Sequence, residues 1–78
     1  MKIEEFIEKI IEQFQDYSGV RITSETIMRD LDEWDSLTGM AVQLTIQDDL
    51  NASIPDDEFL NAKTIGDLYD LMIKHKKQ

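Results

Sequence analysis

The sequence contains no cysteine, one proline, three glycines and only eight Lys and Arg residues among 78. Without cysteine, a disulfide scaffold, a thiol nucleophile and a thiolate zinc site are excluded. With 41% hydrophobic residues and little Pro or Gly, the chain is neither collagen-like nor disordered. Charged residues interrupt the hydrophobic ones, so no run could span a membrane and no signal-peptide core follows Met1. We therefore expect a single cytoplasmic domain over residues 1–78.

The scarcity of basic residues leaves the chain strongly acidic. Seventeen Asp and Glu residues give a net charge of -9, and no Lys or Arg occurs from Asp30 through Ala62. Such a charge repels nucleic acid and anionic membrane surfaces and attracts basic protein patches. We expect basic protein partners, no nucleic acid, no stable membrane insertion and a monomeric chain.

The first half of the sequence predicts one helix and a long connection. Apolar residues at spacings of three and four indicate an amphipathic helix with the apolar face Ile3, Phe6, Ile7, Ile10, Ile11 and Phe14. Residues 16–19 are predicted to end it, because Gly19 tolerates a left-handed conformation. Periodicity is poor over residues 20–34, which predicts an irregular loop held to the core by Val20, Ile22, Ile27, Met28 and Leu31.

The second half predicts three more helices. Asp35 is a predicted N-cap for a helix that begins at Ser36 and runs to about Leu50, where Asn51 ends it. Pro55 can start a short helix whose inward contacts are Phe59 and Leu60. Thr64 and Asp67 have the spacing of a capping box before a last helix with Ile65, Leu68, Tyr69 and Met72 on its apolar side. No strand-like alternation persists, so we predict an all-α four-helix bundle with a long first loop and a short third helix.

The predicted second helix has two apolar faces. At 100° per residue, Leu37, Met40, Ala41 and Leu44 share one side, and Val42, Ile46 and Leu50 share the other. The second face keeps large apolar residues to the helix end and is the better core candidate. The first face is then a partly exposed strip beside Ser36, and its burial against Phe59 and Leu60 is the alternative.

Catalysis by this chain alone is not expected. His75 lies in a Lys-rich tail and is interpreted as a surface residue, and no Gly-x-Ser-x-Gly motif surrounds Ser36. Residues 30–35 do not form a calcium loop, because Trp34 takes the fifth position and Asp35 stands where glycine is required. Trp34 is interpreted as a core or loop-anchoring residue.

Two segments together resemble the acyl carrier protein family. They are residues 31–37, Leu-Asp-Glu-Trp-Asp-Ser-Leu, and residues 54–58, Ile-Pro-Asp-Asp-Glu, and the similarity covers nearly the whole chain in order. The resemblance implies that Ser36 receives 4′-phosphopantetheine from coenzyme A and that Asp35 and Leu37 flank it for recognition. The residues are consistent with this role, because a helix N-terminus favours an anion such as a phosphodiester. The arm would supply the thiol that the sequence lacks.

The same resemblance implies the partners of such a carrier. These are a phosphopantetheinyl transferase, a loading ligase or acyltransferase, and ketosynthase-type or other pathway enzymes with basic docking patches. The predicted partner-binding residues are Met40, Leu44, Asp48, Asp49, Asp56 and Asp57. Glu33 and Trp34 depart from the small residues usual before the motif, which favours a specialised pathway over general fatty-acid synthesis and leaves the cargo open. The alternative is an acidic adaptor that binds a basic protein without a prosthetic group.

Overall fold

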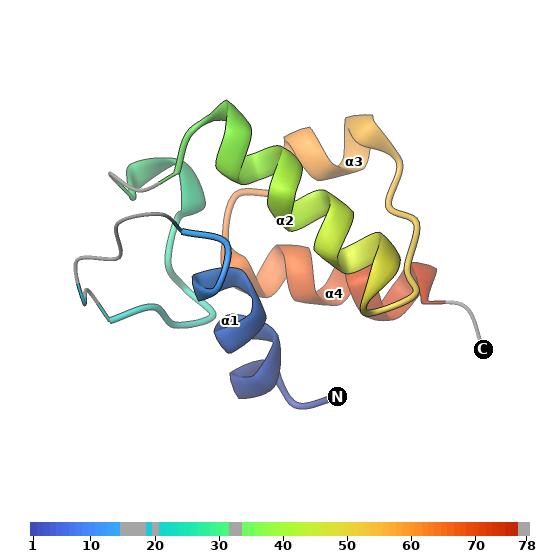
Figure 1. Ribbon diagram of the computed structural model, residues 1–78, viewed down its shortest axis with the longest axis horizontal. Coiled ribbons are helices and arrows are strands. Elements are labelled where there is room, and N and C mark those ends of the chain that lie inside the picture. The colour runs from blue at the N-terminus through green and yellow to red at the C-terminus, as the bar shows by residue number, and fades with distance from the viewer. Residues whose placement is uncertain (15–18, 20, 32–33, 77–78) are drawn as a thin grey trace.

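The computed structural model describes residues 1–14, 19, 21–31 and 34–76. Four α-helices and one short 3-10 helix follow in the order α1 (Ile3–Ile11), η1 (Met28–Asp30), α2 (Ser36–Asp48), α3 (Asp56–Asn61) and α4 (Ile65–His75). No β-strand occurs within these residues, and isolated backbone bridges join Ile27 to Thr64 and Ala52 to Lys76. The predicted all-α fold, with its long first loop and short third helix, is confirmed (Figure 1). None of the helices described is long and apolar enough to cross a bilayer.

The core is assembled from every α-helix and from the long connection. Helix α4 contacts both α1 and α3, and α2 crosses this group in Figure 1. The largest almost fully buried side chains are Phe6, Ile10, Met28, Val42, Ile46, Ile65, Leu68 and Met72. Because Val42 and Ile46 belong to this core, the rotation of α2 about its axis is fixed, and with it the position of the helix start.

Helix α1 is shorter than its hydrophobic pattern predicts. It ends at Ile11, although Phe14 is still buried at 8% exposure and belongs to the core. The predicted terminating residues 16–18 lie outside the described part of the chain. Gly19 has a φ of 83°, the left-handed conformation for which glycine was predicted there.

The connection between α1 and α2 is held to the start of α4. The Met28 amide donates to the Lys63 carbonyl at 3.1 Å, and the Ile65 amide donates to the Thr26 carbonyl at 3.0 Å. These backbone hydrogen bonds, together with the buried side chain of Ile22, hold residues 22–28 of this connection against the rest of the domain.

The residues predicted to anchor this connection differ in their burial. Ile22 and Met28 are buried and Leu31 is half-buried against the core, as expected. The prediction for Ile27 is wrong, because its side chain is 46% exposed while its backbone forms the bridge to Thr64. Val20 lies outside the described residues.

Gly66 allows a close backbone approach between α4 and this connection. Its amide donates to the Ser24 carbonyl at 2.8 Å, and a Cβ at position 66 would lie 2.9 Å from that same oxygen. We expect Gly66→Ala to lower the free energy of unfolding by about 1–3 kcal/mol, as overpacking usually does. Denaturant unfolding measures this loss.

Gly39→Ala is the matched control for Gly66→Ala. Gly39 is also helical, and it is buried, but the nearest atom to its added Cβ would be Cζ2 of Trp34 at 3.6 Å, an ordinary contact. Alanine in a helix interior gains roughly 0.5–1 kcal/mol over glycine, so this variant should be as stable as the parent or more stable. Equal losses in the two variants would show that the contact with Ser24 is unimportant.

Helix α3 has a single buried side chain among its six residues. Phe59 is buried, as predicted, but Leu60 is 65% exposed, so its predicted inward contact is wrong. The physical reason is the 100° step between consecutive helical residues, which turns Leu60 away when Phe59 points to the core. A short helix with one inward residue depends on additional contacts to hold its place.

The predicted signals at the ends of α2 and α4 are confirmed in part. The Thr64 side chain accepts from the Asp67 amide at 3.0 Å, and the Asp67 carboxylate accepts from the Thr64 amide at 3.2 Å, which completes the capping box. Hydrogen bonds from these backbone amides lower the pKa of Asp67 below its ordinary value. Helix α2 ends at Asp48 rather than near Leu50, and Asn51 then takes a left-handed φ of 57°.

Candidate functional site

Ser36 is the first residue of α2, and Asp35 caps that helix. The Asp35 backbone is extended, and its carboxylate accepts from the Thr38 amide at 2.8 Å, as predicted. This hydrogen bond is the main reason that the pKa of Asp35 lies below its ordinary value. The cap therefore stays ionised at neutral pH and fixes where the helix begins.

The Ser36 hydroxyl is available for modification. Ser36 is exposed, and no hydrogen bond within the described residues engages its hydroxyl. The imidazole of His75, the single histidine, forms a hydrogen bond with Glu58 and does not activate this serine. The N-terminus of a 13-residue helix carries a partial positive charge, which favours an anionic substituent at this hydroxyl.

Trp34 anchors the chain immediately before this site. Its side chain is half-buried and packs against the core, which confirms the predicted anchoring role. Gly39, one turn into α2, is buried beneath the indole, because a Cβ there would lie 3.6 Å from Cζ2 of Trp34. Asp32 and Glu33, which directly precede Trp34, lie outside the described residues.

The two faces of α2 behave as predicted. Val42, Ile46 and Leu50 are buried at 1%, 2% and 7% exposure. The apolar strip, which we define as Leu37, Met40 and Leu44, is exposed at 71%, 60% and 56%. The strip follows Ser36 along the outer side of α2, and its predicted alternative, burial against α3, does not occur.

A groove of about 620 Å³ opens beside Ser36 between α2, α3 and η1. Its apolar lining comes from both sides and includes Met28, Trp34, Met40, Phe59 and Leu60. Its polar lining consists of Arg29, Asp35, Ser36, Gln43 and Asp56. We call this space the arm groove, because the serine at its edge could direct an attached group into it.

Polar contacts hold α3 as the far wall of the arm groove. The Gln43 amide donates to the Asp56 carboxylate at 2.7 Å, which ties the middle of α2 to the first turn of α3. At the other end of α3, the Arg29 guanidinium donates to the carbonyls of Leu60 and Ala62. Since Phe59 is the one buried side chain of α3, these polar contacts help to hold the helix in place beside the groove.

The predicted acidic residues fall in two places. Asp48 and Asp49 lie at the C-terminal end of α2, about 18 Å along the helix from Ser36 at 1.5 Å per residue. Asp56 and Asp57 lie in the first turn of α3, where negative charge suits the helix dipole. All four are exposed, and Asp49 makes one long ion pair of 3.9 Å with Lys9. The strip is thus accompanied by exposed carboxylates at its far end and across the groove.

Comparison with known proteins agrees with this geometry. The family described as the phosphopantetheine attachment site matches residues 7–72. This chain belongs to that family. Among solved structures, the carrier is similar to the acetyl actinorhodin acyl carrier protein from Streptomyces coelicolor, with a TM-score of 0.78 over 96% of this chain and 90% of that chain. The identity is 20%, so the likeness concerns the fold, and no curated protein sequence matches.

Family membership defines the prosthetic group and excludes catalysis as the function. Proteins of this family are carriers rather than enzymes, and their group is phosphopantetheine. The described residues fit such a group: Ser36 offers an exposed and unengaged hydroxyl, a helix N-terminus lies beside it, and an open groove adjoins it. The family match favours a carrier over the acidic adaptor.

The interpretation of His75 as a plain surface residue is wrong. Its side chain is 23% exposed, and its Nε2 lies 2.9 Å from a carboxylate oxygen of Glu58, which Lys74 also approaches at 3.7 Å. This hydrogen bond is the main reason that the pKa of Glu58 is lowered. The contact joins α3 to α4 across 17 residues of sequence, so no local pattern could indicate it.

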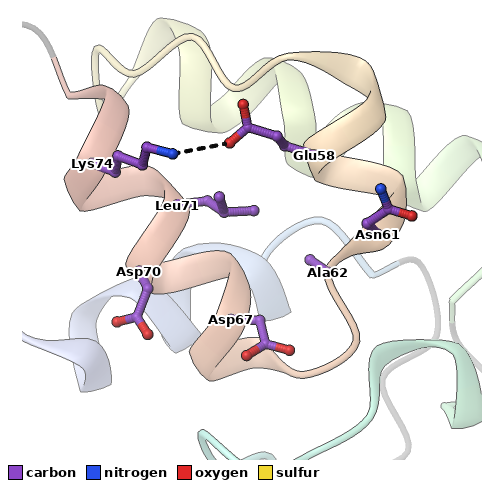
Figure 2. Close-up of a pocket in the computed structure, with 7 residues that line it drawn as sticks. All are labelled: Glu58, Asn61, Ala62, Asp67, Asp70, Leu71 and Lys74. Carbon is purple, nitrogen blue, oxygen red and sulfur yellow. Dashed lines mark ion pairs between the residues drawn. The ribbon is translucent and has the colours of Figure 1, made fainter.

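A second hollow, of about 380 Å³, lies between α3 and α4 and is separate from the arm groove. Figure 2 shows Leu71 between the two helices, with the Lys74 and Glu58 pair at one end and Asp67 and Asp70 along α4. None of the residues that line it lines the arm groove. The hollow therefore has no direct connection to Ser36.

Proposed function

We propose that this chain is an acyl carrier protein whose residues 1–78 form one carrier domain, with phosphopantetheine attached to Ser36. It carries acyl or related intermediates as thioesters and presents them to cytoplasmic enzymes of fatty-acid, polyketide or a specialised biosynthesis. The observation that carries the proposal is the exposed, unengaged Ser36 hydroxyl at the start of α2, at the edge of the arm groove.

Asp35 and Leu37 are proposed to present this serine to a phosphopantetheinyl transferase. Asp35 holds the first turn of α2 in place through its hydrogen bond to the Thr38 amide. Leu37 is 71% exposed and directly adjoins Ser36, so a transferase can contact it without any rearrangement of the core. The transferase activates the hydroxyl, and the chain needs no base of its own.

The arm groove is proposed to receive the cargo between visits to enzymes. Trp34, Met40, Phe59 and Leu60 offer apolar surface beside Ser36, and the thioether of Met40 adapts to irregular shapes. Because its attachment point is at the edge of the groove, a group on the arm reaches this surface by an intramolecular step, at a high effective concentration. The cargo leaves the groove when the carrier docks on a partner enzyme.

Enzyme docking is proposed to use the strip with the carboxylates around it. Met40 and Leu44 supply exposed apolar contact, and Asp48, Asp49, Asp56 and Asp57 supply negative charge for basic patches. These enzymes include a loading ligase or acyltransferase and ketosynthase-type or other pathway enzymes. Long-range attraction speeds encounter, and weak contacts let the carrier leave.

This docking proposal predicts a dependence on salt. With a phosphopantetheinyl transferase as partner, we expect the double reversal Asp48→Lys with Asp49→Lys to reduce kcat/KM roughly tenfold at low salt. The difference should shrink toward 1 M salt, where the Debye length is only about 3 Å. Initial rates of modification across a salt series measure it.

Glu8→Lys with Glu12→Lys is the control for that reversal. Both residues are exposed, Glu8 on α1 and Glu12 at its C-cap, and the change in net charge is the same. A loss of kcat/KM in the Asp48 and Asp49 reversal that does not occur in this control supports local docking at the end of α2. If the parent rate does not change with salt, or if both reversals act equally at every salt concentration, local electrostatic docking is wrong.

Intact mass spectrometry tests the proposed function. After incubation with coenzyme A and a broad-specificity phosphopantetheinyl transferase, we expect the mass to rise by one phosphopantetheinyl group. A folded chain that remains unmodified under conditions in which a reference carrier reacts fully would contradict the proposal.

A further inference from the structure

Arg29 is the sole basic residue among the described residues that line the arm groove. It immediately precedes a stretch without Lys or Arg, from Asp30 through Ala62, that contains most of the groove. Two carboxylates, Asp35 and Asp56, share this lining. An anionic cargo that entered the groove would be repelled by both, and Arg29 is the residue whose charge can offset them.

The guanidinium of Arg29 is held in place by two hydrogen bonds, which use only part of its donor capacity. One terminal nitrogen donates to the carbonyl of Ala62 at 2.9 Å, and the other donates to the carbonyl of Leu60. A guanidinium has five N–H donors, so about three remain after these two hydrogen bonds. Arg29 is exposed and lines the arm groove, so a group inside the groove can approach its guanidinium.

The groove thus combines an apolar wall with one fixed cation. Trp34, Met40 and Phe59 suit a hydrocarbon stem, whereas a purely hydrocarbon cargo would leave the charge of Arg29 unused. Planar guanidinium groups recognise carboxylates better than other side chains do, because two N–H groups match two oxygens. Resting on the proposed function, we infer that Arg29 selects cargo whose far end carries a carboxylate, with the acyl stem against the apolar wall.

Two cargoes of equal length test this inference. The chain is loaded with an octanoyl or a suberoyl phosphopantetheine arm, which differ only in the terminal carboxylate. Hydroxylamine cleaves the thioester, and its rate is measured in the free pantetheine thioester and in the loaded chain. We define protection as the first rate divided by the second. We expect suberoyl protection relative to octanoyl protection to fall roughly two- to fivefold in Arg29→Gln, the size usual for a partly exposed charge pair.

Arg29→Lys and salt provide independent readouts. Lysine keeps the charge and loses the paired geometry, so it should restore part of the preference for suberoyl. In the parent, the preference should weaken as salt rises, because exposed charges are screened. Circular dichroism and thermal melts of each loaded variant confirm that the domain is folded.

The outcomes distinguish cargo selection by Arg29 from a purely structural role of this residue. A change by the same factor for both cargoes in Arg29→Gln would mean that Arg29 only positions α3, and the inference would be overturned. It would also be overturned if suberoyl showed no protection in the parent, or if its preference did not respond to charge or salt. Failure to load either arm on Ser36 would instead contradict the proposed function.

Discussion

Ile46→Ala is expected to lower the free energy of unfolding by about 2–5 kcal/mol, the range for deleting a large buried aliphatic side chain. Ile46 is 2% exposed, and it belongs to the same hydrophobic core as Phe6, Ile10 and Leu50. Its removal leaves a cavity between α1 and α2 that these neighbours fill only in part. Since small domains have a total stability of about 5–15 kcal/mol, the loss is a large share of it.

Met40→Ser is the matched change on the opposite face of α2. Met40 is 60% exposed, so its replacement should cost about 0.5 kcal/mol or less, while cargo transfer to a partner enzyme should be impaired. Thermal melts and a transfer assay on both variants decide the outcome. If Met40→Ser unfolds the domain as badly as Ile46→Ala, the assignment of a core face and an outer face is wrong.

Ser36→Ala is expected to abolish phosphopantetheinylation completely and to leave the domain folded. The stability cost should be at most about 1 kcal/mol, because the cap of α2 is the Asp35 carboxylate and remains in place at 2.8 Å from the Thr38 amide. Intact mass reports the modification, and circular dichroism reports the fold.

Ser53→Ala is the control for this variant. Ser53 is also an exposed serine, but it lies in the connection between α2 and α3 rather than at a helix start. We expect it to be modified at the parent rate. A Ser36→Ala protein that is folded and still gains the group would place the arm on another residue.

Local signals made much of this fold predictable from the sequence. Asp35 and Thr64 were recognisable as caps because a capping side chain binds an amide only two or three residues away. The two faces of α2 were predictable for a similar reason, since helical geometry sets their separation and the face with Ile46 and Leu50 keeps large apolar residues to the helix end. Ser36 followed from its place directly after a cap and from the family resemblance.

Tertiary contacts explain where prediction from the sequence was wrong. Local spacing shows that Phe59 and Leu60 cannot both point inward, but which of them is buried depends on how α3 packs, and the burial of Ile27 depends on how the connection meets the start of α4. The same holds for His75, whose partner Glu58 belongs to another helix. No sequence pattern indicates a role for Arg29, because its contacts with the C-terminal end of α3 span more than thirty positions of sequence.

The attachment of the arm to Ser36 is tested most directly by locating the added group in the modified parent protein. After reaction with coenzyme A and a transferase, the chain is digested and the peptides are fragmented by mass spectrometry. The serines at positions 18, 24, 36 and 53 can be distinguished in this way. Attachment as proposed predicts that the whole of the added mass lies on Ser36, at the first residue of α2. Phosphopantetheine found on any other residue, or a peptide containing Ser36 that remains unmodified in a fully loaded protein, would contradict it.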